Sequence, residues 1–256
     1  MRPRCRSLAF GLRAVAWMCA AWLCAAPWSA ARAEAPAAAA ALPSAADLVY
    51  RTTAQFELAG FPLKMSARTT TNWRRSGDSY EAHLHIEIAD FDQLSEGTIG
   101  RDESLSPRRY TEKRPFHSPE TVSVDWAGGT IRFGDAAPAA APTGGAQDRL
   151  SLQFELVRLR LRHPEGFPAG SAHDVRLIGT HDVDPWTFTV GPEEAIETGA
   201  GTQRAVRYSA RRMAGGVEET MDIWLGADLH WMPIRIRMVD RHHSVIDSVL
   251  QSVAIS

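Results

Sequence analysis

Residues 48–73 read LVYRTTAQFELAGFPLKMSARTTTNW and give the clearest indication of the fold. Apolar or small side chains alternate with polar ones on both sides of the Gly60-Phe61-Pro62 turn. Successive side chains of a strand point to opposite faces, so this period of two predicts two strands, 48–58 and 63–73. Their predicted core faces comprise Leu48, Tyr50, Thr52, Ala54, Phe56 and Leu58, and then Leu63, Met65, Ala67, Thr69, Thr71 and Trp73.

The same alternation continues in residues 80–88, after a turn at Ser76-Gly77-Asp78. Three alternating runs joined by short turns are typical of an antiparallel meander with one buried face. Further strands are predicted at 108–113, 121–125, 130–133, 174–179, 186–190, 203–211, 218–225, 232–239 and 244–255.

One helix is predicted, from Gln147 to Leu161. Its apolar residues recur at helical spacing, and His163-Pro164 with Gly166 ends it. Such a stripe must be buried against another element, and the apolar face of the sheet is available. The predicted fold class is mostly β: a curved antiparallel sheet or open barrel with one central helix packed on its concave face. The stripe consists of Leu150, Phe154, Val157 and Leu161.

The N-terminus predicts export. Arginines precede an apolar run from Ala14 to Trp28. Shortly after this run comes Ala31-Arg32-Ala33, the small-x-small pattern of a signal-peptidase site. We expect a signal peptide over residues 1–33, cleaved after Ala33, and a periplasmic protein. The apolar run is shorter than the roughly 20 residues of a spanning helix, so no stable membrane anchor is expected after cleavage.

The rest of the chain predicts a single β-rich domain over residues 47–256. An Ala/Pro segment, residues 34–46, is predicted to be a disordered lead-in. A second segment rich in Ala, Pro and Gly, residues 135–146, is predicted to be a flexible loop within the domain.

Cysteine content and charge limit the functions of the cleaved chain. The cysteines are Cys5, Cys19 and Cys24, all within the predicted signal, so disulfides, thiolate metal sites and cysteine nucleophiles are excluded after cleavage. Cleavage also removes five of the 28 basic residues and none of the 30 acidic ones, which leaves 23 against 30 and a formal charge of −7. A basic footprint for nucleic acid is therefore absent.

The C-terminal half contains a series of short motifs. In order they are Asp148-Arg149-Leu150-Ser151, Glu193-Glu194, Gly201, Ile223-Trp224-Leu225 and Trp231-Met232-Pro233-Ile234-Arg235-Ile236. This order resembles an uncharacterised family of exported bacterial proteins, domain of unknown function family 3108, and the likeness spans roughly Leu48 to Leu250. The resemblance implies an envelope location and a β-rich fold, and it implies no activity or catalytic residues.

Aromatic residues are the candidate ligand-binding groups. Aromatic side chains on a concave sheet can line a ligand cavity, and ordinary core packing is the alternative. The candidates are Phe154, Trp186, Trp224 and Trp231.

His83 and His85 are a weak candidate metal site. They lie two apart on a predicted strand, so both point to one face together with Glu81 and Glu87. The alternative is a solvent-facing row of polar residues, and no metal or other cofactor is expected.

Catalytic motifs do not identify an active site. The sequence has no G-x-S-x-G elbow, no H-E-x-x-H, no P-loop and no G-x-G-x-x-G, so any catalytic residues are unknown. The favoured hypothesis is a non-catalytic envelope protein that binds an apolar or amphiphilic molecule, or docks on another envelope component. The alternative is a periplasmic hydrolase acting on an envelope polymer.

Overall fold

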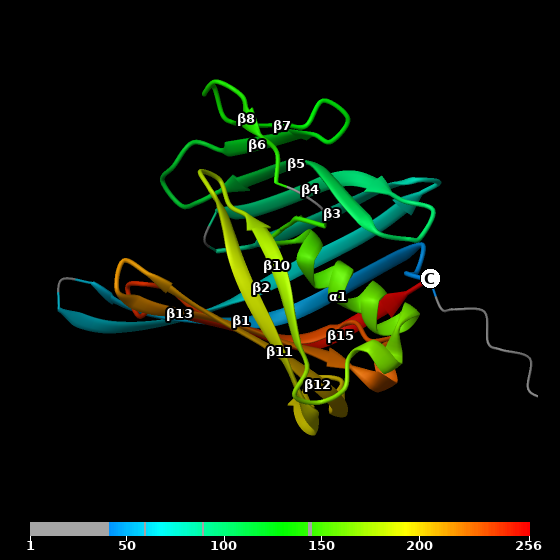
Figure 1. Cartoon of the computed structure of the whole chain (residues 1–256). Helices are drawn as coiled ribbons and strands as arrows, with labels where there is room; N and C mark the ends of the chain where they lie inside the picture. Colours follow the sequence, from blue (N-terminus) through cyan, green and yellow to red (C-terminus); the bar gives the residue numbers. More distant parts are fainter. Residues whose placement is uncertain (1–40, 59, 89, 143–144) are drawn as a thin grey trace, which may run out of the picture. The chain divides into compact units, whose positions relative to one another are not determined.

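The computed structural model describes residues 41–58, 60–88, 90–142 and 145–256. The predicted signal peptide and residues 34–40 of the predicted lead-in lie outside these ranges. The described chain forms one 15-stranded sheet that curves around helix α1 (Ser151–Arg162), as Figure 1 shows. The prediction of a mostly β fold with one helix on the concave face is confirmed, and the sheet is open.

The strand order follows from two meanders. Across the sheet, the strands of the first half of the chain lie in the order β8 to β1, and those of the second half lie in the order β15 to β9. β1 pairs antiparallel with β15 where the two halves meet. The first eight strands are β1 (Ala45–Leu58), β2 (Phe61–Ser76), β3 (Ser79–Ile86), β4 (Phe91–Ile99), β5 (Leu105–Lys113), β6 (Glu120–Asp125), β7 (Thr130–Phe133) and β8 (Ala139–Ala140). The others are β9 (Gln147–Asp148), β10 (Ala172–Ile178), β11 (Val183–Thr198), β12 (Gly201–Ala214), β13 (Val217–Gly226), β14 (Pro233–Val239) and β15 (Val245–Ile255). Two 3₁₀ turns cover Pro164–Gly166 and Ala227–Leu229.

The predicted meander is present, and it continues directly into a strand that the sequence did not reveal. β1 pairs antiparallel with β2, as expected of a meander, and Tyr50 lies opposite Thr69. The additional strand is β4, whose core-facing positions include Gln93, Ser95 and Gly97. Polar and glycine residues on the buried face erase the alternation that identifies a strand.

The helix begins four residues later than predicted. Residues Gln147 and Asp148 instead form β9, which pairs in parallel with β10. The Asp148 carboxylate accepts hydrogen bonds from the backbone N–H groups of Leu150 (2.9 Å) and Ser151 (2.8 Å). These bonds satisfy donors at the start of the helix. The predicted stripe faces the sheet: Leu150, Phe154 and Val157 are fully buried, and Leu161 packs on the same core.

Residues just before position 47 also pack on the described domain. Leu42 and Ala46 are buried in the core, and the Trp73 indole donates a hydrogen bond to the Pro43 carbonyl (2.9 Å). These contacts order the last residues of the Ala/Pro segment. The predicted loop 135–146 likewise contains the short edge strand β8 and ends in a buried Ala146.

Within the described ranges, no helix has the length and apolar character needed to span a membrane.

Candidate ligand-binding cavity

An apolar cavity of about 610 Å³ lies on the concave face of the sheet, beside the N-terminal end of α1. Two groups of strands, β1–β3 and β13–β15, supply most of its apolar wall. β4, the β3–β4 and β5–β6 connections and the start of the helix contribute the rest. The main apolar side chains are Phe56, Met65, Leu84, Ile86, Met221, Ile223, Ile236, Met238 and Ile246.

The cavity exists because the apolar faces of the strands extend further than the helix that covers part of them. Leu48 and Tyr50, at one end of β1, are buried in the core that α1 shares. Towards the other end, the β1–β2 hairpin keeps the same apolar alternation, yet Met65 is 47% exposed. The alternation thus continues into a region where no helix buries it.

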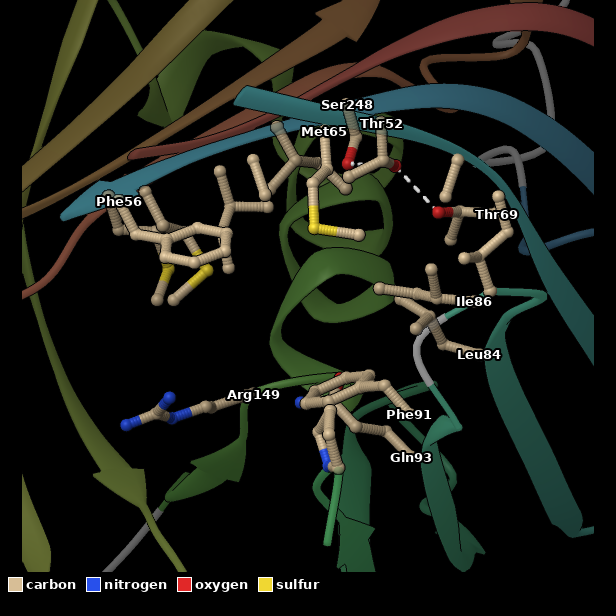
Figure 2. Close-up of a pocket in the computed structure, with 18 of the residues that line it drawn as sticks. Thr52, Phe56, Met65, Thr69, Leu84, Ile86, Phe91, Gln93, Arg149 and Ser248 are labelled. Carbon is tan, nitrogen blue, oxygen red and sulfur yellow. Dashed lines mark hydrogen bonds between the residues drawn. The ribbon is translucent and has the colours of Figure 1, made fainter. Parts of the chain in front are cut away.

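Three buried hydroxyl groups form a polar spot on the sheet wall of this cavity. The Thr52 hydroxyl lies 2.6 Å from that of Thr69 and 2.7 Å from that of Ser248 (Figure 2). Each of the three has a hydrogen-bond partner within the trio, so the spot is compatible with an apolar neighbour.

Arg149 brings the only charge among the residues that line the cavity, all of which the structure describes. Figure 2 shows it across the open space from Phe56 and Met65, on the side of Phe91 and Gln93. Arg149 lies two residues before the first residue of α1, and its neighbours Asp148 and Leu150 are buried. These buried neighbours fix the backbone from which the Arg149 side chain extends to the cavity.

Two glutamine side chains lie in the same wall. Gln93 donates to the Glu112 carboxylate (3.0 Å), which also accepts a hydrogen bond from the Tyr110 hydroxyl (2.7 Å). Burial raises the pKa of Tyr110 far above its ordinary value, so it stays a donor. Gln153 is less well satisfied: its Nε2 reaches only the Arg149 carbonyl at 3.5 Å, and its buried Oε1 has no partner in the described chain.

A buried acid supports the helix start behind the cavity. Burial raises the pKa of Asp148, against the lowering effect of hydrogen bonds from the Ser151 and Leu150 N–H groups and the Ser95 hydroxyl. Ser95 in turn lies 3.2 Å from the Tyr80 hydroxyl. Asp148 is not among the lining residues, so its contacts indicate a structural role.

The four aromatic candidates from the sequence lie elsewhere. Phe154 is buried against Trp73. The Trp186 and Trp231 rings lie under arginine side chains, and the Trp224 indole donates to Glu194 (2.7 Å). None of the four is among the residues that line this cavity, and ligand binding by them stays a prediction.

His83 and His85 share one face, as predicted, and both contact a carboxylate that the sequence did not suggest. His83 Nε2 and His85 Nδ1 lie 3.1 and 2.9 Å from the same Asp92 oxygen. Burial acts to raise the pKa of Asp92, but the hydrogen bonds from His85 and His83 outweigh it and lower the pKa below its ordinary value. Across the described part of the chain, no group of three or more His, Cys, Asp or Glu residues is arranged to hold a metal ion.

The residues that give the cavity its polarity were not predicted from the sequence. Gln93 lies on β4, a strand that its polar core face hides. Arg149 was visible as part of the Asp148-Arg149-Leu150-Ser151 motif, and a cation between two buried positions at the start of an apolar helix is the signal that marks it.

Comparison with solved structures supports the fold. A beta-barrel-like protein of domain of unknown function DUF1849 from Brucella abortus aligns with a TM-score of 0.56 and 11% identity, covering 85% of this chain and 100% of that one. A DUF1329 family protein from Desulfovibrio piger aligns with a TM-score of 0.26 and 8% identity over 84% and 86% of the two chains, too weakly to support an argument. At 11% identity the first likeness concerns the fold alone.

Comparison with protein families is more specific. A search of curated proteins found no significant match. The family described as "Protein of unknown function (DUF3108)" matches residues 50–242, which is more than half of the chain. The protein belongs to the DUF3108 family.

Proposed function

We propose that this protein binds an apolar or amphiphilic molecule in the cavity on the concave face of its sheet. The observation that carries the proposal is an uncovered apolar cavity of about 610 Å³, within the range of roughly 300–1,000 Å³ that is typical of ligand pockets. Burial of apolar ligand surface, at about 25 cal/mol per Å² before entropic costs, would supply the affinity.

The mouth of the cavity supports this proposal. Met65, Ile88, Phe116 and Ile246 line the cavity and are also exposed large hydrophobic residues. The backbone of Phe116 has φ 64°, a left-handed conformation that is costly for a bulky residue. A strained, fully exposed aromatic residue at the rim is suited to contact a ligand that enters or leaves.

Export to the periplasm is part of the proposal. It rests on the signal-peptide pattern that ends at Ala33. The carrier would then act on molecules of the envelope, and docking on an envelope component is the alternative use of the same apolar mouth. The hydrolase alternative has no supporting observation, since no histidine or carboxylate of the described residues lines this cavity.

Native mass spectrometry of the protein purified from its own periplasm tests the proposal. We expect the mass of a polypeptide that starts at Glu34. We also expect a non-covalent adduct of lipid-like mass that organic solvent releases. A mass that retains residues 1–33 would contradict export. A polypeptide without an adduct, from cells in which apolar metabolites are not depleted, would contradict ligand binding.

A further inference from the structure

We infer that the ligand is an amphiphile with an anionic head group, a carboxylate or a phosphate, whose charge is bound by Arg149 while its apolar part lies against the sheet. This inference rests on the proposed function, because it names the chemistry of the molecule that the same cavity takes. Its basis is the juxtaposition of one unpaired guanidinium with a wall that is otherwise apolar or neutral.

The charge of Arg149 is not satisfied by the described part of the chain. Two other partly buried arginines form ion pairs, Arg75 with Glu103 and Arg235 with Asp247 at 2.7 Å. Arg162 and Arg237, which are also partly buried, form no ion pair with a described residue, but they do not line the cavity. Arg149 is also partly buried, yet neither a hydrogen bond nor an ion pair joins its guanidinium to a described residue. A cation placed against apolar side chains without a partner is costly, and a ligand anion would remove that cost.

Nearby acids already have other partners. Glu112 accepts hydrogen bonds from Gln93 and Tyr110, and the Arg114 Nε lies 3.6 Å from its other oxygen. Asp148 adjoins Arg149 in sequence, but its carboxylate accepts its hydrogen bonds from Ser95 and from the start of the helix. The guanidinium therefore stays available to the cavity.

The chemistry of the guanidinium selects the head group. Its planar fork of N–H donors matches the two oxygens of a carboxylate or phosphate, and such charge-assisted hydrogen bonds are stronger than neutral ones. The Gln153 amide lies in the same wall with its oxygen unpartnered and its nitrogen held only by a 3.5 Å bond. Its contacts do not fix the amide, so rotation would present a second donor to the same anion.

The placement also separates head from tail. Figure 2 shows Arg149 on the opposite side of the cavity from Phe56 and Met65, and the only polar groups among the described sheet side chains there are the hydroxyls of Thr52, Thr69 and Ser248, which satisfy one another. An anion at Arg149 would leave the rest of a single-chain amphiphile against apolar surface. A neutral apolar molecule would fill the same space but leave the guanidinium unpaired.

Competitive displacement of a neutral fluorescent probe, N-phenyl-1-naphthylamine, separates charge from apolar binding. Dodecanoate, dodecyl phosphate and dodecanol are titrated below their aggregation limits against wild type, Arg149→Gln, Arg149→Lys and the control Arg51→Gln, an exposed arginine on the opposite face of β1. We expect Arg149→Gln to bind the probe and dodecanol as wild type does, and to lose roughly tenfold or more in affinity for the anion, as loss of a hydrogen bond to a charged group predicts. Arg149→Lys should restore part of the loss, and Arg51→Gln should lose nothing.

The two anions distinguish the head groups, because the one that Arg149→Gln weakens more is the preferred type. Unchanged anion affinity in Arg149→Gln, or wild-type binding of anions no tighter than dodecanol, would overturn the inference while leaving the proposed function standing. Thermal denaturation first establishes that the wild-type protein is folded. If this folded protein binds neither the probe nor dodecanol, the proposed function itself fails.

Discussion

The ring of Phe154 in α1 stacks on that of Trp73 in β2, with the ring centroids 4.6 Å apart and the planes inclined by 27°. Trp73 stacks in turn on Tyr80 of β3, at 5.3 Å. This line of three rings fixes the helix to β2 and β3 at the end where the apolar face of the sheet is covered. The cavity occupies the part of that face that the stack does not reach.

Truncating the helix ring should destabilise the whole domain. Phe154 is fully buried, so Phe154→Ala removes a ring from a packed stack and should cost about 3–5 kcal/mol of unfolding free energy. The control is Phe61→Ala, which removes a ring that is 72% exposed and should change the unfolding free energy by under about 0.5 kcal/mol. Urea denaturation followed by tryptophan fluorescence measures both. Equal small losses would show that the helix is loosely held.

The buried Asp148 should make stability depend on pH in a defined direction. Burial raises its folded-state pKa above the ordinary value of 3.8, so its favourable contribution is complete below pH 3.8 and is lost as the pH rises through the raised pKa. Asp148→Asn keeps an oxygen for the Leu150 and Ser151 N–H groups but cannot ionise.

We therefore expect Asp148→Asn to gain stability relative to wild type as the pH rises above 4. Denaturant melts of both proteins at a series of pH values measure this difference, and subtracting the two curves cancels the other acids. A difference that is independent of pH, or that favours wild type at higher pH, would contradict the raised pKa.

Metal removal should leave the protein unchanged. The ring nitrogens of His83 and His85 contact Asp92 rather than converging with further ligands. We expect EDTA or added zinc to shift the melting temperature by less than about 1 °C, since no folding energy is linked to metal. A shift of several degrees that disappears in His83→Ala would restore the two histidines as ligands.

The sequence predicts those elements whose pattern agrees with their environment. Residues 48–73 alternate cleanly because the first strands have one buried face, and the helix stripe at Phe154 is buried where the 3.6-residue period places it. β4 was not predicted because polar and small residues occupy its core face. Ser95 donates a hydrogen bond to Asp148 there, and Gly97 leaves room for the Tyr80 ring, since a Cβ at position 97 would lie 2.6 Å from that ring. The interactions that favour these two residues come from other elements of the fold.

The site was less predictable than the fold for a physical reason. Aromatic residues on a concave sheet can contact a ligand or pack in the core, and the sequence does not distinguish these two environments; Phe154, for example, is fully buried in the core. A cavity forms where a core element ends, and that depends on the length of α1 relative to the β1–β2 hairpin. Neither the uncovered region nor the facing of Arg149 towards it follows from local periodicity.

Filling the cavity with a bulky side chain tests whether apolar molecules bind inside it. Ala54 lines the cavity, and its neighbour Gln55 is exposed on the opposite face of β1, so Ala54→Trp and Gln55→Trp add the same side chain to the two faces of one strand. N-phenyl-1-naphthylamine fluorescence is titrated with wild type and both variants, after circular dichroism has established that all three are folded. We expect saturable binding to wild type and Gln55→Trp, and at least tenfold weaker binding to Ala54→Trp. Equal binding by all three proteins would contradict ligand binding in this cavity.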